Sequence, residues 1–173
     1  MIDLEKAAAA VSAGDRSAFT RIVAATHERL VRVSARLLGS VPDAEDVVQE
    51  AYVKAYRALA AGKFDGRSKV STWLHRIVLN ATTDAKRARK GEPPRSESSP
   101  PDVAGSTEAR LALRELGDWL STLPDEQQVV VVLKAVEELS SAEIAEILGC
   151  SEGAVEQRLV RARTALRKMG ADS

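Results

Sequence analysis

The chain has 173 residues, enough for one ordinary domain or two small ones, and its 25 basic residues are balanced by 25 acidic residues. Aromatic residues make up 3% of the chain and charged residues 29%, a composition that favours helices over strands. A single cysteine excludes an intramolecular disulfide framework. No long apolar run and no signal peptide is found, which favours a cytoplasmic protein over a membrane protein.

Residues 1–90 contain the pattern of a helical bundle. Residues 3–13 predict a short helix that ends near Gly14, and Asp15 then caps a longer helix that stops at Gly39. Pro42 opens a third helix over residues 42–60. Apolar stripes on the second and third helices predict the core, with Phe19, Ile22, Val23, Leu30, Val33 and Leu37 on one and Val48, Tyr52, Ala55 and Leu59 on the other.

The start of the third predicted helix is acidic. Its first turns carry Asp43, Glu45, Asp46 and Glu50, and its first basic residue is Lys54. Acidic side chains near a helix N-terminus interact favourably with the helix dipole, which is a purely structural explanation. Four acids exceed what capping needs, however, and Asp43, Asp46 and Glu50 share one face of the helix. Two interpretations therefore stay open: a favourably charged helix start, or an acidic docking surface.

A basic loop leads into the fourth predicted helix, which Ser71 can cap. From Lys63 to Arg95, basic residues outnumber acidic ones nine to three. One arc of the helix must face a core, and it carries Trp73, Leu74, Ile77, Val78 and Ala81. Another face carries Arg76, Asn80, Thr83 and Arg87. A cationic face with an amide suits a phosphate backbone with base edges within reach. A basic face that is merely solvated is the alternative.

Residues 91–106 separate two parts of the chain. Gly, Pro and Ser supply ten of these sixteen residues, so the segment cannot bury enough apolar surface to fold. We therefore expect a flexible linker between a first domain of residues 1–90 and a second domain of residues 107–173.

The second domain also predicts helices, over residues 107–122, 124–138 and 140–149 and from Ser151 to about Lys168. The run Val129–Leu133 is β-prone by propensity, but its acidic flanks and Pro124 favour a helix. Ser140 and Glu143 form the pattern of a capping box.

The last two predicted helices have the lengths and spacings of a helix-turn-helix. Ala145 is small where the helices cross, and Gly149 permits a left-handed turn. The start of the last helix would enter a major groove, with Gln157 and Arg158 able to reach bases. A helical hairpin with a structural role alone is the alternative. Inward positions are Val155, Leu159, Ala162, Leu166 and Met169, and outward positions are Gln157, Arg161, Thr164 and Lys168.

Groups for catalysis are scarce. His27 and His75 lie far apart in sequence and lack Cys or acidic partners at ligand spacing, which argues against a metal site. Cys150 lies in the predicted turn, where it packs as a small hydrophobe. No phosphate-binding glycine loop and no nucleophile elbow is found. We expect no catalytic residue, no metal, no cofactor and no small-molecule substrate, and hence no enzyme.

Three motifs, taken in order, resemble the extracytoplasmic-function (ECF) sigma factors of the sigma-70 family over roughly residues 10–170. The resemblance implies an all-α fold of two small helical domains, a σ2 bundle over residues 1–90 and a σ4 helix-turn-helix over residues 107–173, joined by the linker. The family directs bacterial RNA polymerase to promoters, so the implied function is to bind core polymerase and to recognise and melt promoter DNA. The motifs are Asp43–Tyr52, Phe64–Arg87 and the pattern from Leu123 to Arg163.

The resemblance also implies partners and roles. The acidic helix corresponds to the segment that docks on the β′ clamp helices, and further polymerase contact is implied at the β flap. The basic loop and helix correspond to the reader of the minus-ten element, which captures a flipped base, and the last helix to the reader of the minus-thirty-five element. An anti-sigma factor is a further implied partner.

The residues implied in these roles fall into three sets. Asp43, Glu45, Asp46, Gln49 and Glu50 are implied for polymerase, and Lys63, Phe64, Gly66, Arg67, Ser68, Lys69, Arg76, Asn80, Thr83 and Arg87 for the minus-ten element. Ser151, Gly153, Ala154, Glu156, Gln157, Arg158, Arg161 and Arg163 are implied for the minus-thirty-five element.

One departure from the family pattern concerns Glu156 and Gln157, where members often carry Lys or Arg followed by Ser or Thr. A carboxylate repels phosphate but can accept a hydrogen bond from a cytosine amino group. The departure therefore affects the promoter sequence that is read and leaves DNA binding itself in place.

Two other classes of protein share part of this pattern. A free-standing helix-turn-helix transcriptional regulator would use residues 107–170, and it leaves the acidic helix and the basic loop unexplained. An interaction protein that only sequesters a partner is the third class.

Overall fold

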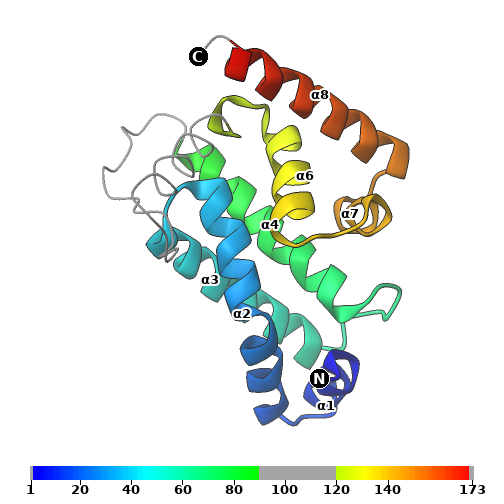
Figure 1. Ribbon diagram of the computed structural model, residues 1–173. Coiled ribbons are helices and arrows are strands. Elements are labelled where there is room, and N and C mark those ends of the chain that lie inside the picture. Colours follow the sequence, from blue (N-terminus) through cyan, green and yellow to red (C-terminus); the bar gives the residue numbers. More distant parts are fainter. Residues whose placement is uncertain (1, 90–119, 172–173) are drawn as a thin grey trace.

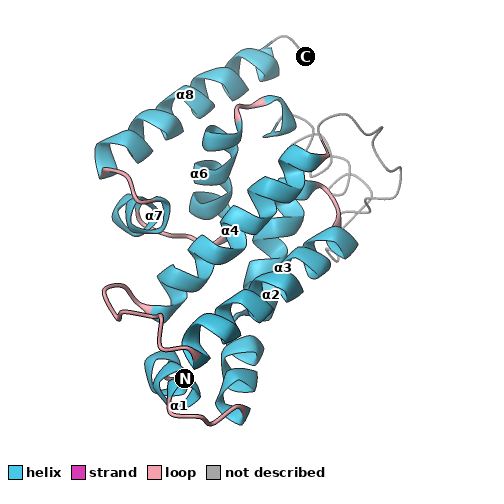
Figure 2. Ribbon diagram, turned by 180° about the vertical axis from the view of Figure 1, so that it is seen from behind, coloured by secondary structure: helices cyan, strands magenta, loops and turns pink. Residues whose placement is uncertain are grey.

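The computed structural model describes residues 2–89 and 120–171, and within these ranges the chain is built of helices joined by short loops, with no strand (Figure 1, Figure 2). The predicted all-α fold is thereby confirmed. The predicted linker and nearly all of the helix predicted at 107–122 lie outside the described residues. The helices are α1 (Leu4–Ser12), α2 (Ser17–Leu38), α3 (Val41–Ala60), α4 (Val70–Ala88), α6 (Asp125–Val136), α7 (Ser141–Leu148) and α8 (Glu152–Ala171).

The boundary between α2 and α3 lies where Gly39 and Pro42 predicted it, whereas the N-cap of α2 is Arg16, one residue after the predicted Asp15. The Asp15 carboxylate accepts a hydrogen bond from the Ser17 backbone N–H at 2.9 Å, and Gly39 ends α2 with a φ of 70°. That left-handed conformation is one that glycine adopts without a Cβ penalty. Ser40 then caps α3, and Pro42 lies in its first turn. Only Gly39 and Ser40 therefore separate the two helices.

The predicted cap of α4 is wrong. The helix begins two residues earlier than a Ser71 cap implies, at Val70, because Lys69 takes the extended conformation that a capping residue needs (φ −61°, ψ 147°). The Glu5 carboxylate of α1 accepts from the Val70 backbone N–H at 3.3 Å, which satisfies one of the N–H groups that lack a partner within the helix. Ser71 lies inside the first turn, and its carbonyl accepts from Nδ1 of His75 at 2.8 Å.

Helices α1 to α4 form the first bundle, in which α2, α3 and α4 pack side by side and α1 covers one end (Figure 1). Its core contains fully buried side chains such as Ile22, Leu30, Leu59 and Leu74, each contributing about 1.5–3 kcal/mol by removal from water. The predicted stripes line this core except for Val33 and Leu37, which lie in a second apolar cluster. A buried polar contact crosses it, because the Ser34 hydroxyl lies 3.0 Å from that of Thr82.

Helices α6 to α8 form the second group. The β-prone valine run lies within α6 and is helical, as its flanks predicted. The capping box at Ser140 and Glu143 is present, and Gly149 ends α7 with a φ of 65°. Val155, Leu159 and Ala162 of α8 are buried, which confirms the inward face of the predicted helix-turn-helix.

The two groups pack against each other in the described structure. Helix α6 contacts α2, and α7 contacts α4 (Figure 1). One apolar cluster contains Val33 and Leu37 of α2, Leu79 of α4, and Leu133 and Ile144 of the second group. The sequence analysis did not predict this shared core. The division into two domains at a linker stays a prediction.

We expect Leu133→Ala to lower the free energy of unfolding by about 2–5 kcal/mol, because it leaves a cavity in that cluster. Leu133 is fully buried, whereas Val160 of α8 is exposed and supplies the matched control Val160→Ala. Urea denaturation followed by circular dichroism measures both. Equal stability of the two variants would contradict the shared core.

Candidate functional site

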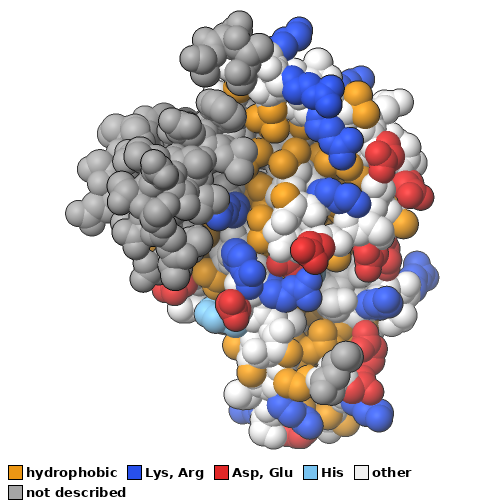
Figure 3. Space-filling view, viewed as in Figure 1, with side chains coloured by type: hydrophobic (Ala, Val, Ile, Leu, Met, Phe, Trp, Pro, Cys, Tyr) orange, Lys and Arg blue, Asp and Glu red, His pale blue; other side chains and the backbone are white. Residues whose placement is uncertain are grey.

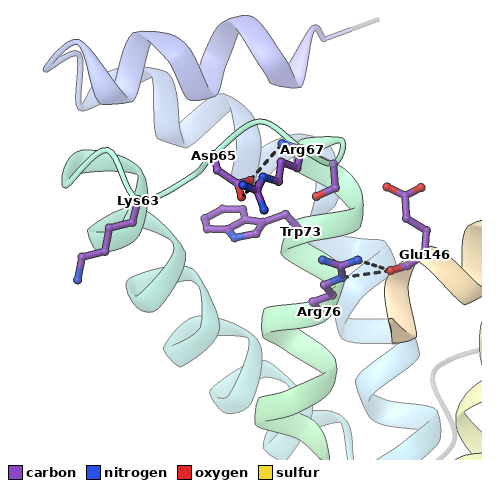
Figure 4. A pocket seen from close by; sticks show the side chains of 7 residues that line it. Lys63, Asp65, Arg67, Trp73, Arg76 and Glu146 are labelled. Carbon is purple, nitrogen blue, oxygen red and sulfur yellow. Dashed lines mark hydrogen bonds and ion pairs between the residues drawn. The ribbon is translucent and has the colours of Figure 1, made fainter. Parts of the chain in front are cut away.

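A hollow of about 390 Å³ lies where the basic loop meets α4 (Figure 4). Three cationic side chains and one indole border it, together with two acidic residues and a serine. Cations that follow a phosphate backbone and an aromatic ring on which a base can stack are the groups with which proteins bind single-stranded nucleic acid. The lining residues are Lys63, Asp65, Arg67, Ser68, Trp73, Arg76 and Glu146.

The loop is held by its own acidic residue. Gly66 has a φ of 69°, and the Asp65 carboxylate accepts from the Arg67 backbone N–H at 3.1 Å. Nε of Arg67 lies 3.4 Å from that carboxylate, yet the Arg67 side chain remains exposed. The turn therefore presents Arg67 at the mouth of the hollow, as Figure 4 shows.

Trp73 has two roles in the structure. It packs against the first core on one side, as the sequence analysis expected, and on the other side its ring borders the hollow (Figure 4). Phe64, which we expected as the apolar wall, is absent from the lining and instead packs on Trp73, with ring centroids 5.1 Å apart. The sequence signal that could have found this role is an aromatic residue in the first turn of a helix that follows a basic loop.

The outer face of α4 is partly covered. Asn80 and Arg87 are exposed and Thr83 is half-buried. Nε of Arg76, however, donates to the backbone carbonyls of Glu146 and Ile147 at 3.2 and 3.1 Å. The structure thus brings a residue of α7 into the rim of the hollow, which sequence reasoning did not anticipate.

The acidic face of α3 consists of four exposed side chains, those of Glu45, Asp46, Gln49 and Glu50. Asp43 differs from them, because its side chain is only 17% exposed and its Oδ1 lies 2.5 Å from Nη2 of Arg89. Asp43 therefore ties the start of α3 to the end of α4 and is not part of the open face that we expected it to share.

Sequence reasoning missed one apolar residue on this face. Val53 is 48% exposed and lies one turn beyond Gln49 and Glu50. A valine outside the buried stripe of α3 is the signal that could have identified it. Its position adds an apolar contact to an otherwise charged surface.

Helix α8 presents the third predicted surface. Oγ of Ser151 accepts from the Ala154 backbone N–H at 3.2 Å, which confirms the predicted cap. Figure 3 shows Lys and Arg side chains gathered over the α8 end of the molecule. The exposed residues of the predicted set are Ser151, Gly153, Glu156, Gln157, Arg161 and Arg163, and Ala154 and Arg158 are half-buried.

Two of these residues have partners within the protein. Nη2 of Arg158 lies 2.9 Å from Oε2 of Glu126, and its Nη1 is 3.5 Å from Sγ of Cys150. The Glu156 carboxylate accepts a hydrogen bond from the Ser141 hydroxyl at the start of α7. Glu156 therefore links the two helices of the helix-turn-helix, a structural reason for a carboxylate at the start of a helix that is otherwise basic.

Two classes of feature are absent from the part of the chain that the structure describes. Residues 2–89 and 120–171 contain no group of three or more His, Cys, Asp or Glu side chains that could hold a metal ion. None of the helices in these ranges is long and apolar enough to cross a bilayer.

Comparison with known proteins gives consistent matches along the chain. Family models described as "Sigma-70 region 2" and "Sigma-70, region 4" match residues 22–92 and 113–166. The ECF RNA polymerase sigma factor SigW of Bacillus subtilis is 37% identical, with 91% of each chain covered. The ECF RNA polymerase sigma-E factor of Escherichia coli is 33% identical, with 90% of this chain and 88% of that protein covered.

Two solved structures are similar over most of the chain. CnrH, in complex with the cytosolic domain of CnrY, has a TM-score of 0.77 and 32% identity and covers 99% of this chain and 100% of its own. The sigma factor RpoE of Bartonella quintana, in complex with the anti-sigma factor NepR, has a TM-score of 0.70 and 25% identity and covers 87% of this chain and 94% of its own.

Proposed function

Because the chain belongs to the extracytoplasmic-function (ECF) sigma factors of the sigma-70 family, we propose that its three surfaces divide the work of promoter recognition. The protein is a sigma factor, which binds core RNA polymerase and recognises and melts promoter DNA. A free-standing regulator is not favoured, because the region 2 match over residues 22–92 covers the acidic helix and basic loop that such a protein would not need. The residue roles below are our proposal.

The hollow at the start of α4 is the observation that carries the proposal. A base of the non-template strand that leaves the stack needs an aromatic or apolar surface and hydrogen-bonding groups. Trp73 supplies the surface, Ser68 a hydroxyl, and Lys63 and Arg67 the charge for the flanking phosphates. Exposed Asn80 and Arg87 continue this face along α4 toward the rest of the minus-ten element.

Helix α8 reads the minus-thirty-five element in this proposal. Its N-terminal turns enter the major groove, where exposed Gln157 can reach base edges, and Arg161 and Arg163 contact phosphates. Arg158 reads a base only if DNA replaces its partner Glu126. Glu156, bonded to Ser141, positions the reading helix and can also accept from a cytosine.

The acidic face of α3 docks on the β′ clamp helices. Glu45, Asp46 and Glu50 supply charge, and Val53 supplies an apolar contact one turn beyond them along the helix. Protein interfaces usually combine such apolar contacts with polar and charged ones.

Partners and setting follow from the same reasoning. The solved structures similar to this chain include a sigma factor held by an anti-sigma factor, and we propose such a partner here. Covalent chemistry is left to the polymerase. The protein works in the cytoplasm, where polymerase and promoter DNA are found.

We expect Asp46→Arg and Glu50→Arg each to weaken binding to core polymerase by about ten-fold, or about 1.4 kcal/mol, since each places a like charge against a basic partner. Fluorescence titration with core polymerase and with a β′ clamp-helix fragment measures the affinity. Glu28→Arg is the matched control, because Glu28 is an exposed acidic residue of α2, outside the α3 face, and this variant should bind as the unaltered chain does. Unchanged affinity of both α3 variants would remove α3 as the docking helix.

We expect Asn80→Ala to slow promoter opening about five-fold, since it removes a hydrogen bond of about 1 kcal/mol to an unpaired base, and to leave closed binding unchanged. Permanganate reactivity of melted thymines measures opening, and gel shift of the holoenzyme measures closed binding. Asp84→Ala, also exposed on α4, is the control. An equal loss in both steps would assign Asn80 to duplex binding instead.

A further inference from the structure

Helices α6 and α7 cover part of the surface that the proposed function gives to DNA. Nε of Arg76, at the rim of the hollow, donates to two backbone carbonyls in the last turn of α7. The carbonyls at a helix C-terminus lack partners within the helix and carry the negative end of its dipole. They therefore offer Arg76 the same kind of group that a phosphate would offer. One turn of α7 and a DNA phosphate cannot occupy this position together.

Charge complementarity extends along the contact. Nζ of Lys86 lies 2.9 Å from Oδ1 of Asp125, and Lys86 also donates to the Gln128 side chain. Lys86 is near the C-terminal end of α4, whereas Arg76 is near its start. The second group thus binds two cationic side chains of α4, one with a carboxylate and one with backbone carbonyls.

A buried carboxylate lies at the centre of the contact. The side chain of Glu137, the C-cap residue of α6, is 1% exposed, and its Oε2 lies 2.7 Å from Nε of Arg29 and 3.6 Å from Nε2 of His75. Burial raises the pKa of the Glu137 carboxyl, but the neighbouring His75 ring and the charge of Arg29 outweigh burial, so that the pKa lies below its usual value. The group is held as a carboxylate between two residues of the first bundle.

This arrangement is specific, because a buried charge is tolerated only when its partners are in place. If α6 moves away, Glu137 gains water, but Arg29 and His75 lose their shared acceptor, and Val33, Leu37 and Leu79 lose their apolar cover. The contact between the two groups therefore has two possible states. In the closed state Glu137 is paired, and in the open state α4 is exposed.

We propose that the free chain is autoinhibited by its own second group, with Glu137 as the latch and the α7 carbonyls occupying Arg76 in place of promoter DNA. The inference rests on the proposed function and concerns how promoter binding is regulated. Promoter binding requires that polymerase or another partner first open the contact. Any partner that stabilised the closed form would keep the factor inactive without touching the DNA-binding residues.

The test uses the full chain with Glu137→Gln, and separately with Arg29→Gln. Arg29 is 54% exposed, so its replacement leaves the folded bundle intact even if the variant at buried Glu137 is unstable. Small-angle X-ray scattering measures the radius of gyration. Fluorescence anisotropy measures binding to short random-sequence single-stranded DNA. We expect both variants to expand and to bind this DNA about ten-fold more tightly, because apparent affinity rises with the fraction of binding-competent molecules.

Matched controls separate the latch from charge alone. Glu138→Gln makes the same change at the exposed neighbouring residue, and Arg32→Gln makes it one turn further along α2, where Arg32 pairs with exposed Glu28. Both controls should keep the radius and the DNA affinity of the unaltered chain. Folded latch variants with unchanged radius and unchanged DNA affinity would overturn the proposal, as would controls that open equally.

A transcription assay with core polymerase distinguishes this proposal from the proposed function. If the unaltered chain supports specific initiation but the latch variants behave like it in scattering and DNA binding, only the latch fails. If neither the unaltered chain nor any variant supports initiation, the proposed function fails, whatever the scattering shows.

Discussion

Helix α4 has to satisfy three neighbours at once, and the arrangement of the molecule follows from this constraint. Leu74 and Val78 are buried in the first core, Leu79 lies in the cluster shared with the second group, and the proposed function requires Arg76 and Asn80 to contact DNA. A helix offers only about a third of its circumference to each neighbour. In the described structure the second group covers part of the α4 surface that the proposed function assigns to DNA. Binding and closure therefore compete on one helix.

Much of the fold could be predicted because it depends on local signals. Gly39 and Gly149 mark helix ends, the capping box at Ser140 marks a start, and apolar periodicity marks buried faces. The valine run of α6 shows where context outweighs propensity, since flanking helix signals decide a segment whose residues favour strands. The Ser71 cap was wrong because α4 begins before Ser71, at Val70, whose backbone N–H is bound by Glu5, a residue distant in sequence.

The candidate site was predictable in outline but not in its partners. The exposed residues of α3, α4 and α8 follow from helical periodicity. The pairing of Asp43 with Arg89, of Glu156 with Ser141 and of Arg158 with Glu126 depends on how helices are brought together, which periodicity does not specify. The same holds for Trp73, whose ring serves the core and the hollow at once. Helical periodicity assigns each side chain to one face, so it does not identify a side chain that contacts two parts of the structure.

The two-residue corner at Gly39 and Ser40 has a mechanical consequence. Because so short a connection has no slack, α3 cannot swing independently of α2, and α2 is the helix on which α6 rests. We therefore expect a displacement of α3 to shift the surface of α2 that α6 contacts. Binding of a large partner to α3 would in this way loosen the contact between α2 and α6, because the Gly39–Ser40 connection couples α3 to α2.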